Sequence, residues 1–165
     1  MSYRNKTYVI FDGDEDMWAY GFMKGWRKNQ NVEFDFFDAH ELNTITARSS
    51  EENTKRKLRE RLANTKQAIV LIGEKTKNLY RFVRWEIEVC QELGIPIVAV
   101  NLNKERDYDS GFCPPILNNA DAMHVSFNMK IIKLALDGFC ANYHKYQGRN
   151  TNWHYNDDIY KGFGL

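Results

Sequence analysis

Three stretches of the chain are apolar without alternation, which is the pattern of strands covered on both faces of a parallel sheet. They span residues 7–11, 67–73 and 96–102. Residues 32–37 alternate between apolar and polar side chains, and residues 122–125 form a shorter apolar run. Both patterns predict further strands, so we expect five strands in all.

The segments between these strands show the three- and four-residue spacing of amphipathic helices. Helices are predicted over residues 17–28, 50–64, 79–93 and 129–143. Gly94 follows the third helix and is suited to end it, because glycine adopts the left-handed conformation at little cost. Strands that alternate with helices predict a flavodoxin-like, doubly wound α/β domain, with a five-stranded parallel sheet and helices on both faces.

The chain is expected to form one domain followed by a tail. Its 165 residues suit a single domain, and no interior linker rich in proline or glycine divides them. We assign residues 1–146 to the domain and residues 147–165 to the C-terminal tail. The tail is rich in Asn, Gly and Tyr, and two outcomes stay open for it, a packed arm or a mobile segment.

The charge balance of the chain narrows its possible partners. Lys and Arg number 23 and Asp and Glu number 22, so the net charge of +1 lacks the basic excess of general nucleic-acid binders. No apolar run approaches the ~20 residues that cross a bilayer, and the N-terminus lacks the apolar core of a signal peptide. We expect a soluble cytoplasmic protein that binds neither nucleic acid nor membrane. The three cysteines are too widely spaced for a zinc site, and no metal is predicted.

Familiar catalytic and phosphate-binding motifs are absent, since the chain has no GxxxxGK[ST], GxGxxG, GxSxG or HExxH. Position therefore defines the candidate residues, because ligands of doubly wound sheets bind beyond the carboxyl ends of the strands. Asp12 and Asp38 directly follow two predicted strands. Asp14 and Asp16 come shortly after the first, where a carboxylate can instead serve only to cap the next helix.

One charged residue of the predicted helix over residues 79–93 lies on its apolar side. At about 100° per residue, Glu86 falls between Leu93 and Leu79, inside the apolar arc. An ionised carboxylate that faces a dry core costs several kcal/mol unless it is paired or stands in a cleft. Three interpretations follow: a structural ion pair with Arg4 or Lys6, a helix rotated enough for the side chain to reach solvent, or a functional carboxylate. The last is open because sequences break local rules at functional sites.

Four segments of the chain carry a family resemblance. They are VIFDGDED at residues 9–16, AIVLIGEKT at 68–76, RFVRWEIE at 81–88 and GIPIVAV at 94–100. Together they resemble the TIR-like domains of the bacterial Thoeris anti-phage defence system. The resemblance covers about residues 6–143 and is most specific between Leu71 and Glu88.

The resemblance implies an enzyme for which NAD is the substrate, with no separate cofactor. TIR domains of this type break the bond between nicotinamide and ribose, and they release nicotinamide with an ADP-ribose product. In the Thoeris branch that product is commonly a cyclic or conjugated signal that activates a separate effector. The resemblance also implies homo-oligomers and a phage-derived trigger.

The resemblance also assigns roles to residues. The essential glutamate of the family follows a tryptophan by four residues, and this WxxxE motif places the role on Glu86, with Phe82 at the tryptophan position. Phe82 keeps an apolar ring but lacks the indole N–H. Glu86 is expected to bind the hydroxyls of the nicotinamide ribose and to stabilise an oxocarbenium-like transition state. By position, the loops after the first two strands are expected to line the pocket with Phe11, Asp12, Asp14, Phe37 and Asp38.

Two other functions fit the same fold. One is a non-catalytic TIR interaction module, which would gain nothing from a carboxylate on a buried helix face. The other is an enzyme resembling nucleoside deoxyribosyltransferases, which would also use a glutamate but would act on nucleosides. The sequence argues against a receiver-type phosphorylation domain, because residues 67–73 contain no aspartate.

Overall fold

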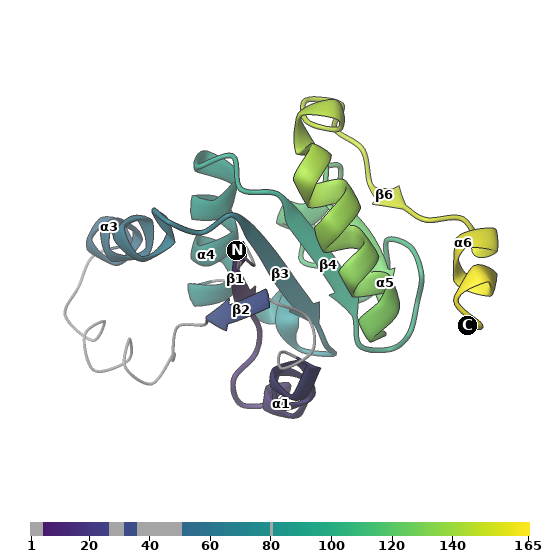
Figure 1. Cartoon of the computed structure of the whole chain (residues 1–165). Coiled ribbons are helices and arrows are strands. Elements are labelled where there is room, and N and C mark those ends of the chain that lie inside the picture. The colour runs from purple at the N-terminus through teal and green to yellow at the C-terminus, as the bar shows by residue number, and fades with distance from the viewer. Residues whose placement is uncertain (1–4, 27–31, 36–50, 80) are drawn as a thin grey trace.

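The computed structural model describes residues 6–26, 51–79 and 81–165, together with the backbone of Asn5 and of residues 32–35. Phe37 and Asp38, two of the predicted pocket residues, lie outside these ranges, and so does Arg4. The sheet is wholly parallel, with the strand order β2-β1-β3-β4-β5-β6 (Figure 1). Its strands are β1 (Asn5–Ile10), β2 (Val32–Asp35), β3 (Gln67–Ile72), β4 (Ile97–Asn101), β5 (Met123–Ser126) and β6 (Trp153–His154).

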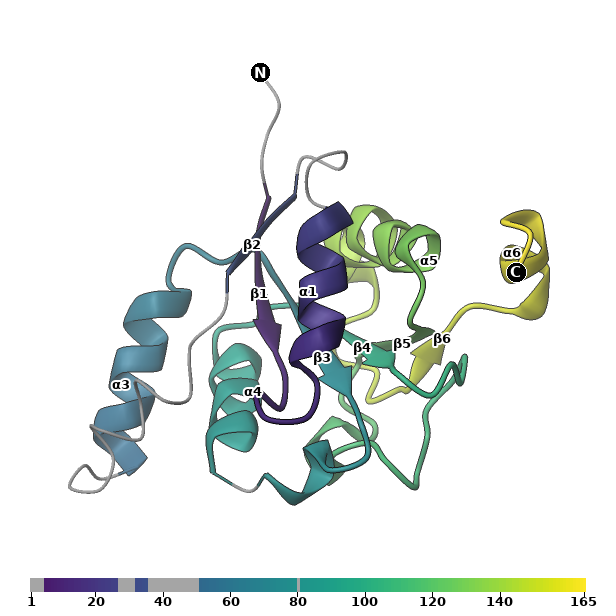
Figure 2. The same cartoon turned by 90° about the horizontal axis from the view of Figure 1, so that it is seen from below.

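Helices cover both faces of this sheet, as Figure 2 shows. One face carries α1 and α5, and the other carries α3 and α4. The helices are α1 (Met17–Trp26), α3 (Glu51–Leu62), α4 (Phe82–Glu92), α5 (Met129–Leu134) and α6 (Asp157–Gly162). The predicted fold class, a doubly wound flavodoxin-like α/β domain, is confirmed. Within the described residues, no helix combines the length and the apolarity that a membrane crossing requires.

The side chains of β3 explain why this strand is apolar without alternation. Ile69 and Leu71 pack into the core beneath α1 and α5. Ala68, Val70 and Ile72 point to the opposite face and pack into the core beneath α3 and α4. Since successive residues of a strand face opposite sides, a strand covered on both faces must be apolar at every position.

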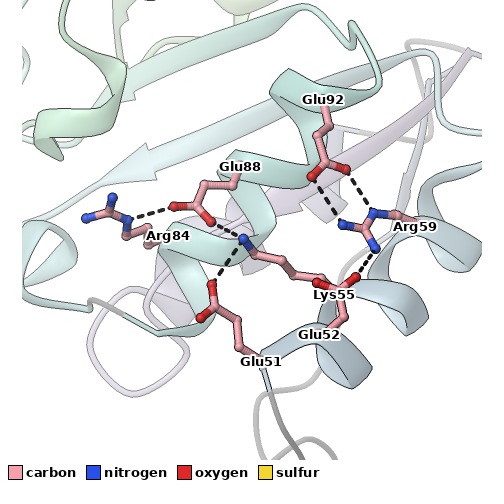
Figure 3. Close-up of polar contacts among 7 residues, drawn as sticks. All are labelled: Glu51, Glu52, Lys55, Arg59, Arg84, Glu88 and Glu92. Carbon is pink, nitrogen blue, oxygen red and sulfur yellow. Dashed lines mark hydrogen bonds and ion pairs between the residues drawn. The ribbon is translucent and has the colours of Figure 1, made fainter.

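Helix α3 contacts α4 through a small apolar seam and a larger set of charges. Leu58 and Leu62 supply the buried apolar contacts of α3. Around this seam, Lys55 pairs with Glu51 and Glu88, Arg59 pairs with Glu52 and Glu92, and Arg84 pairs with Glu88 (Figure 3). Each ion pair at the surface contributes only about 0–1 kcal/mol, so the charges orient α3 more than they hold it in place.

The structure differs from the predicted elements at the C-terminal end. The predicted helix over residues 129–143 is α-helical only in α5, continues as a π-helical turn (Ala135–Phe139) and ends as a 3₁₀ segment (Cys140–Lys145). At Asn142 the backbone leaves helical geometry, and its side-chain amide donates a hydrogen bond to the Gly138 carbonyl at 2.8 Å. The tail then adds β6, a two-residue strand beside β5 that the hydrophobic pattern did not predict.

The tail packs against the rest of the domain. The Asp121 carboxylate accepts hydrogen bonds from the backbone N–H groups of Gly148, Arg149 and Thr151, at 2.9–3.1 Å. The ring of Tyr160 in α6 is fully buried in the core beneath α1 and α5. Its hydroxyl accepts a hydrogen bond from the Ser126 backbone N–H at 3.2 Å. The end of the chain therefore completes one face of the sheet.

Replacing the buried tyrosine of the tail is expected to destabilise the whole domain. Tyr160→Ala should lower the free energy of unfolding by about 3–5 kcal/mol, the usual cost of deleting a buried aromatic ring. The neighbouring Ile159 is 38% exposed, so Ile159→Ala is the matched control and should cost less than about 1 kcal/mol. Urea denaturation of both variants measures the difference. Equal losses in the two variants would contradict the packed position of the tail.

Candidate active site

Glu86 lies in the second turn of α4 and points at the sheet. Only 6% of this residue is exposed, which confirms the burial that its helical position predicts. It faces the Tyr8 hydroxyl of β1, although the two side chains make no hydrogen bond of regular geometry. Burial raises the pKa of the Glu86 carboxyl to about 8, while the Tyr8 hydroxyl and the charge of Arg61 act in the opposite direction. The carboxyl group is therefore largely protonated at neutral pH in this structure.

The positive charge that acts on Glu86 comes from α3. Arg61, in the last turn of that helix, lowers the pKa of the carboxyl through its charge. Lys6, one of the two partners that the sequence suggested, does not contribute to that pKa and has an exposed side chain. Burial and the charge of Glu86 also raise the pKa values of Tyr8 and Cys90. Glu86 is thus a desolvated acid between α4 and β1, without a direct salt bridge among the described residues.

The loop between β1 and α1 is organised by Asp12. Its buried carboxylate accepts hydrogen bonds from the backbone N–H groups of Asp14 at 3.0 Å and Glu15 at 3.4 Å. Its backbone carbonyl accepts a third from the N–H of Asp16 at 2.8 Å. Asp14 itself is exposed. Asp12 therefore fixes the loop, and Phe11 before it stacks on Tyr20 with ring centroids 5.0 Å apart.

Asp16 is the residue of this loop that sequence reasoning passed over as a site. It is 6% exposed and borders a cavity of about 290 Å³ at the carboxyl ends of β1, β3 and β4. Its Oδ2 atom has no hydrogen-bond partner among the residues that the structure describes. Burial and the nearby charge of Asp12 raise its pKa to about 6, although a hydrogen bond with Thr76 opposes them.

The position of the Asp16 carboxylate depends on Gly73, the glycine that follows β3. A Cβ atom at Gly73 would lie 2.3 Å from Asp16 Oδ2, so only glycine leaves room for the carboxylate here. The signal was present in the sequence, as an acid shortly after the first strand and a glycine at the end of the third. The close approach of the two residues depends on loop geometry, which the hydrophobic pattern does not determine.

The remaining walls of the cavity are aromatic and acidic. Trp18 and Phe112 border it from two different segments of the chain. Glu15 and Glu74 border it as well, and Lys75 is paired with Glu15 at 3.0 Å. With Asp16, the walls thus carry more carboxylates than cations, which disfavours the entry of a phosphate group.

Glu86 and the cavity are separate features of the described residues. Glu86 is not among the side chains that border the cavity. Phe82, in the first turn of α4, is half-buried and contacts Trp85 edge to face, with ring centroids 5.7 Å apart. Of the predicted pocket residues, Phe11, Asp12 and Asp14 lie together in or beside the β1–α1 loop. Within the described residues, no cluster of His, Cys, Asp and Glu is arranged to hold a metal ion.

A doubly wound parallel sheet with a buried glutamate on the helix after β3 is the arrangement that the resemblance to TIR-like domains predicts. Comparison with known families then identifies the family. The model described as "Thoeris protein ThsB, TIR-like domain" matches residues 8–107, more than half of the chain, and the chain belongs to this family. It is accordingly a TIR protein of anti-phage defence. A search of curated proteins finds no match.

The burial of Glu86 makes stability depend on pH. Its pKa is about 8 in the fold and near 4.5 in an unfolded chain, so the folded state binds the proton more tightly. Stability is lost as the pH rises between these two values. Glu86→Gln removes this loss, so its unfolding free energy relative to wild type should increase by about 3–5 kcal/mol between pH 5 and pH 9.

Urea denaturation at several pH values measures this difference, and Glu88→Gln is the matched control. Hydrogen bonds from Arg84 and Lys55 lower the pKa of Glu88, so its ionised form is favoured throughout that range. The stability difference of the control variant should therefore stay constant above pH 5. A constant difference for Glu86→Gln as well would show that Glu86 is not desolvated.

Proposed function

We propose that the protein consumes NAD, breaking the bond between nicotinamide and ribose and releasing nicotinamide with an ADP-ribose product. That product, cyclic or conjugated, is the signal that activates a separate effector. The observation that carries the proposal is the buried carboxyl group of Glu86 at the WxxxE position of a TIR-like domain. The membership of the chain in an anti-phage family supports the signalling role.

The chemistry of the bond suits a single carboxylate. Nicotinamide leaves as a neutral molecule from a cationic ring, so no strong acid is required to protonate it. The ribose left behind develops oxocarbenium character, which a carboxylate close to the sugar stabilises, as in glycoside hydrolysis. Water then attacks the ribose to give linear ADP-ribose, or a nucleophilic atom of the same molecule attacks to give a cyclic product.

Burial makes the ionisation of Glu86 depend on the binding of a cationic substrate. The free carboxyl is mostly protonated at neutral pH because its pKa is about 8. A cationic pyridinium brought beside it favours the ionised form and lowers that pKa. Because the site is desolvated, the attraction between the carboxylate and the cation is stronger than it would be in water. Substrate binding and ionisation of Glu86 therefore support one another.

Access to Glu86 requires local movement. Since only 6% of the residue is exposed, a ribose reaches its carboxyl only when neighbouring side chains separate. Helix α3 supplies Arg61 on that side and holds to α4 through surface charges and a small apolar seam. A phage-derived trigger or self-assembly would act by opening this site, and the closed site would keep the enzyme silent before infection.

The non-catalytic alternative is less well supported. A module that works only through assembly would replace the acid on the buried face of α4 with an apolar residue, since a desolvated carboxyl lowers stability above its unfolded pKa. The chain instead retains Glu86 there without a direct salt bridge among the described residues.

The primary test follows nicotinamide release from NAD by chromatography, with and without lysate of phage-infected cells. Glu86→Gln should lower the rate at least about 100-fold, the usual effect of removing a group that stabilises transition-state charge. Glu88→Gln is the matched control on the same helix and should keep the wild-type rate. A Glu86→Gln variant with wild-type activity would exclude Glu86 as the catalytic residue, and no nicotinamide release under either condition would reject the proposed reaction.

The reaction should also depend on pH through the same group. Because the ionised carboxylate is the active form, kcat/KM for NAD should rise with pH and level off above about pH 8, the pKa of Glu86 in the free protein. Initial rates at low NAD concentration between pH 6 and pH 9 measure the profile. A profile that falls over this range would show that the protonated acid is the form that acts.

A further inference from the structure

Tyr8 of β1 carries a hydroxyl group that the packing of the fold does not explain. The residue is 1% exposed and lies in the core beneath α3 and α4, where its hydroxyl makes no hydrogen bond of regular geometry with the described residues. We propose that Tyr8 is a positioning residue for Glu86, whose hydroxyl donates a hydrogen bond to the carboxylate when the acid ionises. This inference rests on the proposed function for the reaction that Glu86 catalyses.

Packing accounts for the ring of Tyr8 but not for its hydroxyl. The neighbour of Tyr8 on β3 is Ala68, a small apolar residue of the same core. A phenylalanine ring would make the same apolar contacts there. A buried hydroxyl without a regular partner lowers stability, so its presence in a folded protein requires an explanation. The polar side chain that this hydroxyl faces is Glu86.

The two side chains complement one another once Glu86 has lost its proton. A protonated carboxyl group has an O–H of its own to donate, whereas an ionised carboxylate only accepts and needs donors. Tyr8 is suited to be such a donor, because burial and the charge of Glu86 raise the pKa of its hydroxyl well above the usual value near 10. The hydroxyl therefore keeps its proton at every pH at which Glu86 titrates.

The other groups that act on Glu86, or respond to its charge, do not supply this hydrogen bond. Arg61 of α3 acts on the carboxyl group through its charge and not through a hydrogen bond. Cys90 lies one turn further along α4, and burial raises the pKa of its thiol, which is a weak donor. Among the described side chains, Tyr8 is thus the one strong hydrogen-bond donor at the Glu86 carboxyl group.

The position of Tyr8 in the sheet makes it a rigid support for the carboxylate. β1 is paired on both sides, with β2 and with β3. A carboxylate has two oxygens, and a hydrogen bond to one of them fixes the direction in which the other points. With one oxygen held by Tyr8, the other is left for the hydroxyls of the substrate ribose. Support of this kind from a regular element keeps a reacting group in its productive geometry.

An NMR titration of the Glu86 carboxyl carbon in Tyr8→Phe tests the contact in the free protein, without NAD. Loss of the hydroxyl should raise the pKa of Glu86 from about 8 by about one unit or more, because a hydrogen bond to the ionised form favours that form. Tyr160→Phe is the matched control, since it deletes a buried hydroxyl on the other face of the sheet. It should leave the pKa of Glu86 within about 0.3 units. An unchanged pKa in Tyr8→Phe overturns the proposal.

A second measurement needs no substitution of Tyr8. In the wild type, the NMR signal of the Tyr8 ring carbon that carries the hydroxyl should shift with a midpoint near pH 8, as Glu86 ionises beside it. Glu86→Gln should abolish this shift. A Tyr8 signal that stays constant while Glu86 titrates overturns the proposal, even if Tyr8→Phe does not fold.

Kinetics distinguish positioning from a merely structural role. In a protein that cleaves NAD, the kcat/KM of Tyr8→Phe should fall about tenfold at pH 7 and recover most of this loss above about pH 9, because the ionisation of Glu86 is displaced to higher pH. A loss of equal size at every pH would indicate a structural effect and overturn the proposal. A protein that leaves NAD intact refutes the proposed reaction alone, because the two NMR titrations decide the contact independently.

Discussion

The desolvation of a single carboxyl group is the constraint on which the account of this protein depends. Glu86 is held between α4 and β1, facing Tyr8, in a place where a charged group loses its hydration. Burial raises the pKa of Glu86 to about 8, and the fold tolerates this acid because it stays largely protonated. A group in that state is poised to ionise when a positive charge arrives. In the proposed reaction NAD brings such a charge on its nicotinamide ring, and a cost to stability would then become a means of catalysis.

The architecture around Glu86 follows from the same two-sided packing that makes the strands apolar. Because both faces of the sheet are covered, the carboxyl ends of β1, β3 and β4 are where its polar groups gather, and the cavity beside Asp16 forms there. Glu86 lies to one side, in α4, which contacts α3 through a small apolar seam and surface charges.

Hydrophobic periodicity predicted the strands and the buried face of α4. It did not predict contacts that depend on the geometry of loops. The positions of β3 and β4, the burial of Glu86 and the left-handed Gly94 after α4 (φ +67°) follow from which residues face the core. The contact of Asp16 with Gly73 joins residues far apart in sequence, and periodicity carries no information about it. The same holds for the tail, where Tyr160 is buried by tertiary packing rather than by a repeating pattern.

The most direct test of the central claim is the pKa of Glu86 itself, measured by following its side-chain carboxyl carbon in an NMR titration. In the free protein the account predicts a value near 8, and this value should fall when a non-cleavable analogue of NAD with a cationic ring is bound. A titration near 4.5 in the free protein, unchanged by the analogue, would contradict it, because Glu86 would then be a solvated carboxylate remote from the substrate.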